Sequence, residues 1–376
     1  SKVVAWIDAA VFGLNEGNGN DPGRVTMRRL NKVEYNYTVH DLVGVDLDLA
    51  DAFPADEIGY GFDNISDLLS IPPLLMEKYL KAGEKIVEAT WSKDESRERI
   101  LICSPKKKSE MKTCARKIIK AFGLRAFRRP LTSSETAALV SLVELAVKND
   151  DGFDKGIQLA VQAMLVSPHF LFRVEIDPKP DDPEAVRALN DYELASRLSY
   201  FLWSSMPDDE LFELARTRGL RRRSVLEKQV ERMLADKRSQ ALVQTFAAHW
   251  LGIRTMKLVT PDEETFPDFD QQLRDAMCRE TELFFEEIMK KDLSVLLFID
   301  SDFTFLNQRL AEHYGIRGVS GAKHQRVALK DGRRGGVLTQ GTVLTITSDP
   351  TRTSPVKRGK WILEQILGSP PPPPPP

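Results

Sequence analysis

Apolar residues recur every three or four positions along most of this chain, the spacing that places side chains on one face of an α-helix. Short stretches rich in glycine, proline or charge separate the periodic segments. The pattern predicts helices at residues 1–12, 31–43, 73–86, 113–123, 133–147, 156–165, 190–202, 207–217, 222–235, 237–251 and 268–291.

Two of these helices begin with a clear capping signal. Asn31 is followed three residues later by Glu34, and Asn190 is followed by Glu193 at the same spacing. In such a capping box each side chain accepts a hydrogen bond from the other residue's backbone N–H, so donors at the helix start are satisfied. The expected buried face of the second helix consists of Leu194, Leu198, Phe201 and Leu202.

Strand signals are few. The best β-branched run, Val337 to Thr347, is also compatible with a helix, and strands do not alternate with helices anywhere. The predicted fold is therefore all-α (mainly α), with two or three packed helical subdomains and little or no β structure.

The linkers suggest where the domains begin and end. With 376 residues the chain is longer than the roughly 250–300 residues that one hydrophobic core usually serves, and the segment DPKPDDPEA from Asp177 has the composition of a linker. We expect an N-terminal helical domain at residues 25–100, a second helical segment at 101–180, a central helical domain at 187–318 and a C-terminal segment with a proline-rich end at 330–376.

Charge and hydropathy narrow the classes of partner. The 53 basic and 55 acidic side chains leave a formal charge of −2, and the basic runs at Lys106–Lys108 and Arg221–Arg223 lack interleaved aromatics, so nucleic-acid binding is not expected. No apolar run reaches the ~20 residues that span a bilayer. The chain is therefore expected not to cross a membrane.

The three cysteines encode no metal or haem motif. Cys103 and Cys114 lie in one short connection, and Cys278 stands alone in a predicted helix. Spacing leaves both a disulfide and two free thiols open for the first two. Because CxxC, CxxCH and His/Cys clusters are missing from the sequence, neither a zinc site nor covalent haem attachment is expected in this chain.

The segment TSDPTRTSPVKRG is a candidate anion- or partner-binding site. Ser354 can cap a helix that starts at Pro355, and Arg352, Lys357 and Arg358 would then surround the N-terminus of that helix. Alternatively, these cations pair with acidic residues of the preceding domain and hold the loop in place.

The acidic segment GYGFDNISD and its neighbours offer oxygen ligands for a hard cation such as calcium. The candidates are Asp56, Asp63, Asn64 and Asp67, although their spacing matches no EF-hand. The more ordinary interpretation is that Asp63 or Asn64 caps the next helix.

Glu280 is the single weak candidate for a catalytic residue. It falls on the apolar stripe of the long helix at 268–291, and burial could raise its pKa into the range of a general acid. The alternative is an ion pair with a nearby arginine.

His249, beside Trp250, could approach an external cofactor, but a histidine buried in the core is the more common case. The sequence contains no hydrolase, kinase or dinucleotide-binding motif.

Several blocks of the chain resemble a known family. They are RRLNKVEYNYTVHDLVGVD, GYGFDNISDLLSIPPLLMEKYL, AFRRPLT with LVSPHFLFRVE, LASRLSYFLWSSMPDDELFELA and TSDPTRTSPVKRGKWILEQILGSPPPPPP. In this order they resemble the large exported planctomycete- and myxobacterial-type proteins made of a series of domains of unknown function, centred on the domain numbered fifteen ninety-two. The resemblance covers nearly the whole chain.

The resemblance implies a setting that the residues alone do not. In that family the series follows a c-type cytochrome domain, so residues 1–24 would be the trailing helix of such a domain plus a linker, and haem c is expected on a neighbouring domain or subunit. The chain would be the middle of a longer polypeptide. The resemblance also implies a disulfide between Cys103 and Cys114, and a periplasmic or otherwise exported location.

The leading functional hypothesis follows from the resemblance. The chain would be the helical body of a periplasmic cytochrome-c-associated protein, acting as a redox-complex component or docking module for a cytochrome c domain or subunit and other proteins of a complex. One alternative is an exported enzyme acting on carbohydrate, with Glu280 or Asp63 in its site. Another is a structural scaffold.

Overall fold

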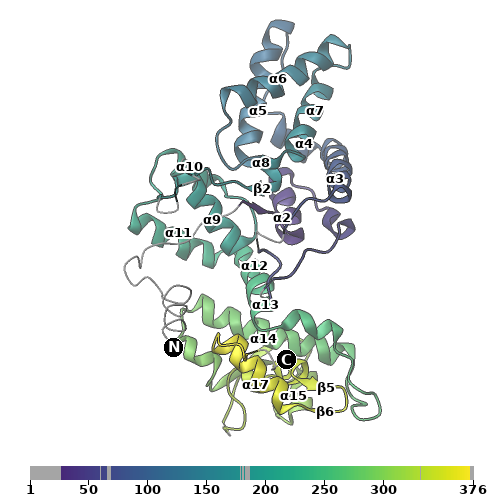
Figure 1. The fold of residues 1–376 in the computed structure, drawn as a ribbon, viewed down its shortest axis with the longest axis vertical. Coiled ribbons are helices and arrows are strands. Elements are labelled where there is room, and N and C mark those ends of the chain that lie inside the picture. The colour runs from purple at the N-terminus through teal and green to yellow at the C-terminus, as the bar shows by residue number, and fades with distance from the viewer. Residues whose placement is uncertain are drawn as a thin grey trace, which may run out of the picture.

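The protein is mainly α-helical, as the periodicity predicts (Figure 1). The computed structural model describes residues 27–59, 61–65, 69–177, 179, 182, 187–330 and 332–372. The predicted helix at 1–12, and with it the expected trailing helix and linker at 1–24, lies outside these residues. Among the described residues, no helix is long and apolar enough to cross a membrane.

The helices follow one another closely along the chain. The α-helices are α2 (Lys32–Val43), α3 (Pro73–Trp91), α4 (Asp94–Ile100), α5 (Lys108–Ala126), α6 (Ser133–Lys148), α7 (Phe153–Leu165), α8 (Pro168–Leu171), α9 (Asp191–Trp203), α10 (Asp209–Arg216), α11 (Arg223–Ala235), α12 (Gln240–Leu242), α13 (Ala248–Trp250), α14 (Gln271–Lys290), α15 (Gln308–Tyr314), α16 (Gly341–Ile346) and α17 (Pro355–Trp361). Short 3₁₀ turns are η3 (Leu49–Ala52), η5 (Lys237–Ser239), η7 (Ile253–Leu258), η8 (Val295–Phe298) and η9 (Val337–Thr339), and π-helical turns are η6 (Val243–Ala247) and η10 (Ile362–Ile366).

The strands form short antiparallel pairs. They are β1 (Arg28–Arg29) with β2 (Phe172–Arg173), β3 (Phe303–Leu306) with β4 (Gln325–Ala328), and β5 (Ser348–Asp349) with β6 (Arg352–Thr353). The pairing of β3 with β4 is not evident from the sequence, because β4 is mostly exposed and lacks an apolar alternation. The β-branched run from Val337 to Thr347 is helical instead, in η9 and α16.

Both predicted capping boxes are present. Asn31 accepts a hydrogen bond from the backbone N–H of Glu34, and the Glu34 side chain accepts one from the backbone of Asn31. Asn190 and Glu193 make the same reciprocal pair at the start of α9. These boxes explain why the two helices begin where the sequence predicts.

The first packing unit contains α2 to α8 and one continuous core. Tyr35 lies at its centre, with ring centroids 5.1 Å from Phe53, 5.5 Å from Tyr79 and 6.0 Å from Phe170. Buried residues from Leu30 to Leu171 belong to the same cluster. Residues assigned to separate segments at 25–100 and 101–180 thus share one core.

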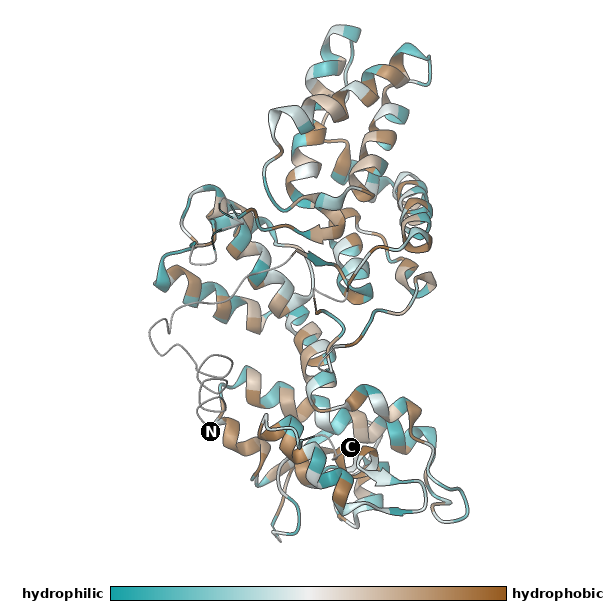
Figure 2. Cartoon of the chain, in the orientation of Figure 1, coloured by the Kyte–Doolittle hydropathy of each residue, from teal (hydrophilic) through white to brown (hydrophobic). Residues whose placement is uncertain are grey.

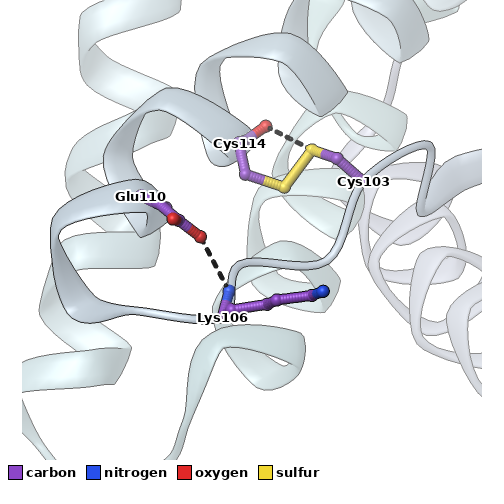
Figure 3. The surroundings of a disulfide bond; sticks show 4 residues. All are labelled: Cys103, Lys106, Glu110 and Cys114. Atoms are coloured by element: carbon purple, nitrogen blue, oxygen red, sulfur yellow. Dashed lines mark hydrogen bonds between the residues drawn. A yellow bond between two sulfur atoms is a disulfide. The ribbon is translucent and has the colours of Figure 1, made fainter.

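A disulfide joins Cys103 to Cys114 within this unit, the pair that the resemblance implies (Figure 3). It connects the segment after α4 to the first turns of α5. The side chain of Glu110 accepts a hydrogen bond from the backbone N–H of Lys106, 2.9 Å away. This bond is a second link within the loop that the disulfide closes. Cys278 is a free, half-buried thiol.

The second and third units follow the linker. In the second, α9, α10 and α11 pack around Trp203, whose indole N–H donates to the Met233 carbonyl and whose ring carries the Arg238 guanidinium at 3.5 Å. In the third, α14 is surrounded by η6, α15, α16 and β3. C-terminal residues such as Val343 and Trp361 join the core of this unit, so the segment at 330–376 packs against the central segment.

The predicted helix at 237–251 is a composite that connects the second and third units. Its successive parts are η5, α12, η6 and α13, and the π-helical turn η6 lies in the middle. Figure 1 shows α12 and α13 as the narrow waist between the upper and lower parts of the molecule. Hydrophobic and hydrophilic positions alternate along the helices of all three units, as amphipathic packing requires (Figure 2).

Candidate functional site

The most site-like feature is a cleft beside this waist. It has a volume of about 440 Å³ and lies between α2, the loop at 61–65, α9, α11 and the η6–α13 segment. Its lining combines charged and polar residues with apolar ones. The charged and polar residues include Arg28, Asn31, Glu34, Asp63, Asn64, Arg173, Arg197, Thr245 and His249, and the apolar residues include Phe62, Leu194, Leu198, Phe201, Leu226, Val230, Leu242 and Phe246.

Asp63 is the centre of one polar wall. Its Oδ1 accepts a hydrogen bond from Asn31 Nδ2 at 2.8 Å, and its Oδ2 lies 2.6 Å from Arg254 Nη1 and 3.2 Å from His249 Nε2. Burial by itself would raise the pKa of Asp63, but the hydrogen bonds and charges of His249 and Arg254 outweigh it and lower the pKa to about 2. Asp63 is therefore an ionised anchor.

His249 is fixed by main-chain geometry as well as by Asp63. Its Nδ1 lies 2.6 Å from the Thr245 carbonyl oxygen, which can only accept, so Nδ1 carries a proton. Its Nε2 faces both Arg254 and Asp63. The ring packs on Phe62 with centroids 5.6 Å apart. The two nitrogens are thus engaged by the protein's own groups.

The other polar wall is basic. Arg173 lies 3.6 Å from the buried carboxylate of Glu34, and Arg197 forms a close, two-pronged pair with Glu175. Burial raises the pKa of Glu34, and the charge of Arg173 opposes that rise only in part. Arg28 lines the same wall and has no ion pair within the described residues.

The apolar wall corrects one prediction. Phe201 was expected on the buried face of α9, but it is 61% exposed and lines the cleft. Leu202 is buried as predicted, whereas Leu194 and Leu198 are half-buried and also line the cleft. Part of the apolar stripe on α9 is therefore buried in the core, and part of it lines the cleft. Such an arrangement suits a ligand with an apolar body and a charged group.

The candidate metal ligands that the structure describes have different surroundings. Asp63 lies in the cleft, and exposed Asn64 lines it, but Asp56 accepts hydrogen bonds from the Arg29 guanidinium and the Lys32 backbone N–H. Asp67 lies outside the described residues. Within the described part of the chain, no group of three or more His, Cys, Asp or Glu side chains could hold a metal ion.

Glu280 is fully buried within a hydrogen-bonded network. It is 1% exposed and accepts hydrogen bonds from Thr304 Oγ1 and the Tyr314 hydroxyl, both at 2.6 Å. Its partners are thus two hydroxyls and not the arginine expected in the alternative interpretation; Arg334 lies over the Tyr314 ring. Burial raises the pKa of Glu280 to about 7, with the two hydrogen bonds opposing that rise. The geometry fits a structural acid.

The candidate anion loop contains an acid that pairs with two of its three cations. Ser354 caps α17, as predicted, but Asp349 lies 2.6 Å from Lys357 and 3.6 Å from Arg352. Pairing with an acid was the alternative interpretation, although the acid belongs to this loop and not to the preceding domain. Arg358 donates to the Thr347 hydroxyl. A cavity of about 430 Å³ lies beside these residues, and anion or partner binding there stays a prediction.

The basic wall is what the sequence interpretation missed. Arg28, Arg173 and Arg197 are far apart in the chain, and each looks like an ordinary surface arginine in its own segment. The signal that could have found them is their position inside the resembling blocks, in the stretches RRLN, LFRVE and LASRL. Only the antiparallel pairing of β1 with β2, and the packing of α9 beside it, brings the three together.

Comparison with known proteins matches four family models in succession along the chain. Each is described as a protein of unknown function: DUF1587 over residues 28–92, DUF1595 over 114–175, DUF1592 over 189–316 and DUF1588 over 334–376. Together these models form a cytochrome-c-associated series. Neither the curated proteins nor the solved structures contain a significant match.

Proposed function

The chain belongs to the cytochrome-c-associated series of unknown-function domains centred on DUF1592, and from this premise we propose that it is the helical body of a redox complex that docks a c-type cytochrome domain. Haem c would reside on that neighbouring domain or subunit. The proposal is supported above all by an apolar groove in the third unit that no other described element covers.

The apolar groove lies along the end of α14 and the η8 turn. Its floor is aromatic, from Phe246, Trp250, Phe285 and Phe298, and Asp292 is the one charged residue among those that line it. Three of its aliphatic side chains face solvent: Val295 is 72% exposed, Leu296 69% and Ile299 45%. A contiguous apolar surface of this kind usually marks a site of protein contact.

A cytochrome domain suits this groove for a physical reason. The edge at which electrons enter and leave a covalently held haem is apolar and solvent-exposed, and transient redox encounters use small interfaces, below about 1,200 Å². A short apolar groove with few charges can meet such an edge without burying unpaired ions. The rigid aromatic floor would keep the contact in one orientation.

The disulfide supports the proposed location. Disulfides persist in oxidising compartments such as the bacterial periplasm and are rare where thiols are kept reduced. The Cys103–Cys114 bond is compatible with export, and the series is cytochrome-c-associated. We therefore propose a periplasmic or otherwise exported location for the complex.

The enzyme alternative gains nothing from Glu280. A general acid must come within hydrogen-bond reach of a substrate, but this carboxyl is enclosed and lines none of the cavities described above. Asp63 does line a cleft, yet both of its oxygens are engaged by Asn31, His249 and Arg254. Neither carboxylate favours carbohydrate chemistry over docking.

The test begins with the natural protein. We would purify it from its source, record the haem absorption spectrum, and titrate this chain by calorimetry with the haem domain or subunit obtained from that preparation. Leu296→Lys should weaken binding at least tenfold, because a charge would be buried in the groove. Leu145→Lys, at a 54% exposed apolar position on α6, is the matched control. A haem-free, partner-free natural protein, or equal binding by both variants, would contradict the proposal.

A further inference from the structure

An arginine-lined cavity adjoins the cleft on the side away from Asp63. It has a volume of about 380 Å³ and shares Arg28, Arg173 and Arg197 with the cleft, so these three side chains form a ridge between the two hollows. Its further charged residues are Arg128, Arg129, Glu175, Arg187 and Glu193. We call the three shared residues the arginine ridge.

The cavity has more cations than carboxylates to pair with them. Four of its six arginines have a carboxylate partner: Arg129 pairs with Glu135, Arg173 with Glu34, Arg187 with Glu193 and Arg197 with Glu175. Arg128 is 4% exposed and donates to three main-chain carbonyls and the Tyr200 hydroxyl. These acceptors are neutral, so its positive charge is not cancelled. Arg28 has no ion pair within the described residues.

The arginine ridge is electrostatically unfavourable as it stands. Arg28 and Arg173 are direct cross-strand partners in the β1–β2 pair, and like charges at opposite positions repel. Arg197 approaches the same place from α9. Partial burial lowers the pKa of Arg28, and the charges of Arg173 and Arg197 lower it further, while the charges of Glu175 and Glu34 oppose this shift only in part. A bound anion would relieve this repulsion.

The surroundings define what kind of anion fits. Guanidinium groups recognise planar carboxylates through paired hydrogen bonds. On the cleft side of the arginine ridge the wall is apolar, from Leu198, Phe201 and Leu226, and Phe201 is largely exposed. An inorganic ion would leave this wall in water.

We propose that the arginine ridge binds the carboxylate of an amphipathic organic ligand whose apolar body lies in the cleft against Leu198 and Phe201. The carboxylate sits between Arg28, Arg173 and Arg197 and supplies the negative charge that this cluster lacks. The arginine ridge lies outside the apolar groove of the third unit, although Phe246 lines both that groove and the cleft. The proposal does not depend on cytochrome docking.

The first experiment separates head group from body. Calorimetry at constant ionic strength would compare decanoate, decanol and acetate, with sodium sulfate as a compact anion. Decanoate should bind at least tenfold more tightly than each of the others. Only decanoate has both a carboxylate for the arginine ridge and an alkyl chain for the apolar residues of the cleft. Tighter or equal binding of sulfate or acetate would overturn the organic ligand, and equal binding of decanol would overturn the role of the arginines.

The second experiment uses Arg28→Gln. Since Arg28 has no ion pair to lose among the described residues, the variant should fold and bind decanoate at least tenfold more weakly. Without ligand it should melt at the same or a higher temperature, because repulsion between the arginines is relieved. The control is Arg125→Gln, whose arginine pairs with exposed Asp209 on the surface and should leave decanoate binding unchanged. Undiminished binding by Arg28→Gln, or equal losses in both variants, would refute the site.

Discussion

Asp63 and Arg254 are joined by a 2.6 Å contact between Oδ2 and Nη1, although 191 residues separate them in the sequence. Asp63 belongs to the loop that follows the first helices, and Arg254 begins the third packing unit in η7. The contact therefore fastens the first unit to the third across the waist. It also closes one wall of the cleft.

Removing this contact should loosen the waist. Asp63→Ala leaves Arg254 and His249 without their carboxylate, and we expect a loss of about 1–2 kcal/mol of unfolding free energy, because the pair is partly buried. Urea unfolding measures the loss. The control is Asp209→Ala, which breaks a surface pair with Arg125 and should cost less than about 0.5 kcal/mol. Equal losses would show that the Asp63 contact is not special.

The same contact has a defined pH dependence. The pKa of Asp63 is lowered from 3.8 to about 2, so the folded protein keeps this carboxylate ionised where the unfolded chain protonates it. The contribution of Asp63 to the unfolding free energy is complete above about pH 4 and is lost as the pH falls toward 2. Between pH 5 and 2 the unfolding free energy should fall less steeply with decreasing pH in Asp63→Asn than in the wild type.

The pH dependence of stability that comes from Glu280 should have the opposite sign. Burial raises its pKa from 4.5 to about 7, so between these values the folded protein holds a proton that the unfolded chain has released. Stability contributed by this group is therefore full below about pH 4.5 and falls by about 3 kcal/mol as pH rises to 7. Glu280→Gln should flatten this dependence, while exposed Glu264→Gln should not. Parallel pH curves for wild type and Glu280→Gln would contradict the prediction.

The free thiol of Cys278 should be unreactive. Burial raises its pKa from 9.0 to about 11, and only the thiolate attacks alkylating reagents. At pH 8 the thiolate fraction, and with it the labelling rate, should be about 100-fold below that of an ordinary cysteine. A colorimetric thiol assay in native buffer and in urea gives the comparison, and rapid labelling of the native protein would disprove it.

The disulfide should stabilise the first unit. Closing the short loop between Cys103 and Cys114 restricts the unfolded chain, and loops of this size contribute about 3 kcal/mol. Replacing both cysteines with serine should lower the unfolding free energy by that amount. Reduction of the wild type by dithiothreitol is the control, and it should lower stability to a similar extent.

Gly156 tests the close packing of α6 on α7. A Cβ at this position would lie 2.8 Å from the Val143 Cα, too close for the backbone to accept without a shift. Gly156→Ala should therefore destabilise the protein by about 1–3 kcal/mol. Gly359→Ala, in α17 with nothing within 4 Å of the added atom, should instead leave stability unchanged or raise it by up to about 1 kcal/mol.

Local chemistry along the chain determined most of the helices. The stripes of α3, α6 and α14 and the capping boxes at Asn31 and Asn190 are satisfied within a few residues, so periodicity and capping suffice to predict them. The burial of Glu280 also follows from its place on an apolar stripe. The signals for these features lie close together in the sequence, although the groups that enclose Glu280, Thr304 and Tyr314, are distant from it.

The tertiary structure alone decided the sites. Phe201 lies on an apolar stripe yet faces a cavity, because none of the elements that the structure describes covers that part of α9. Asp63 reaches Arg254, and Arg28 meets Arg173 and Arg197, only after units distant in the chain have packed together. Charges exert their effects through space and leave no periodic trace in the sequence, so the pairing that makes an anchor or a binding surface emerges only in the folded chain.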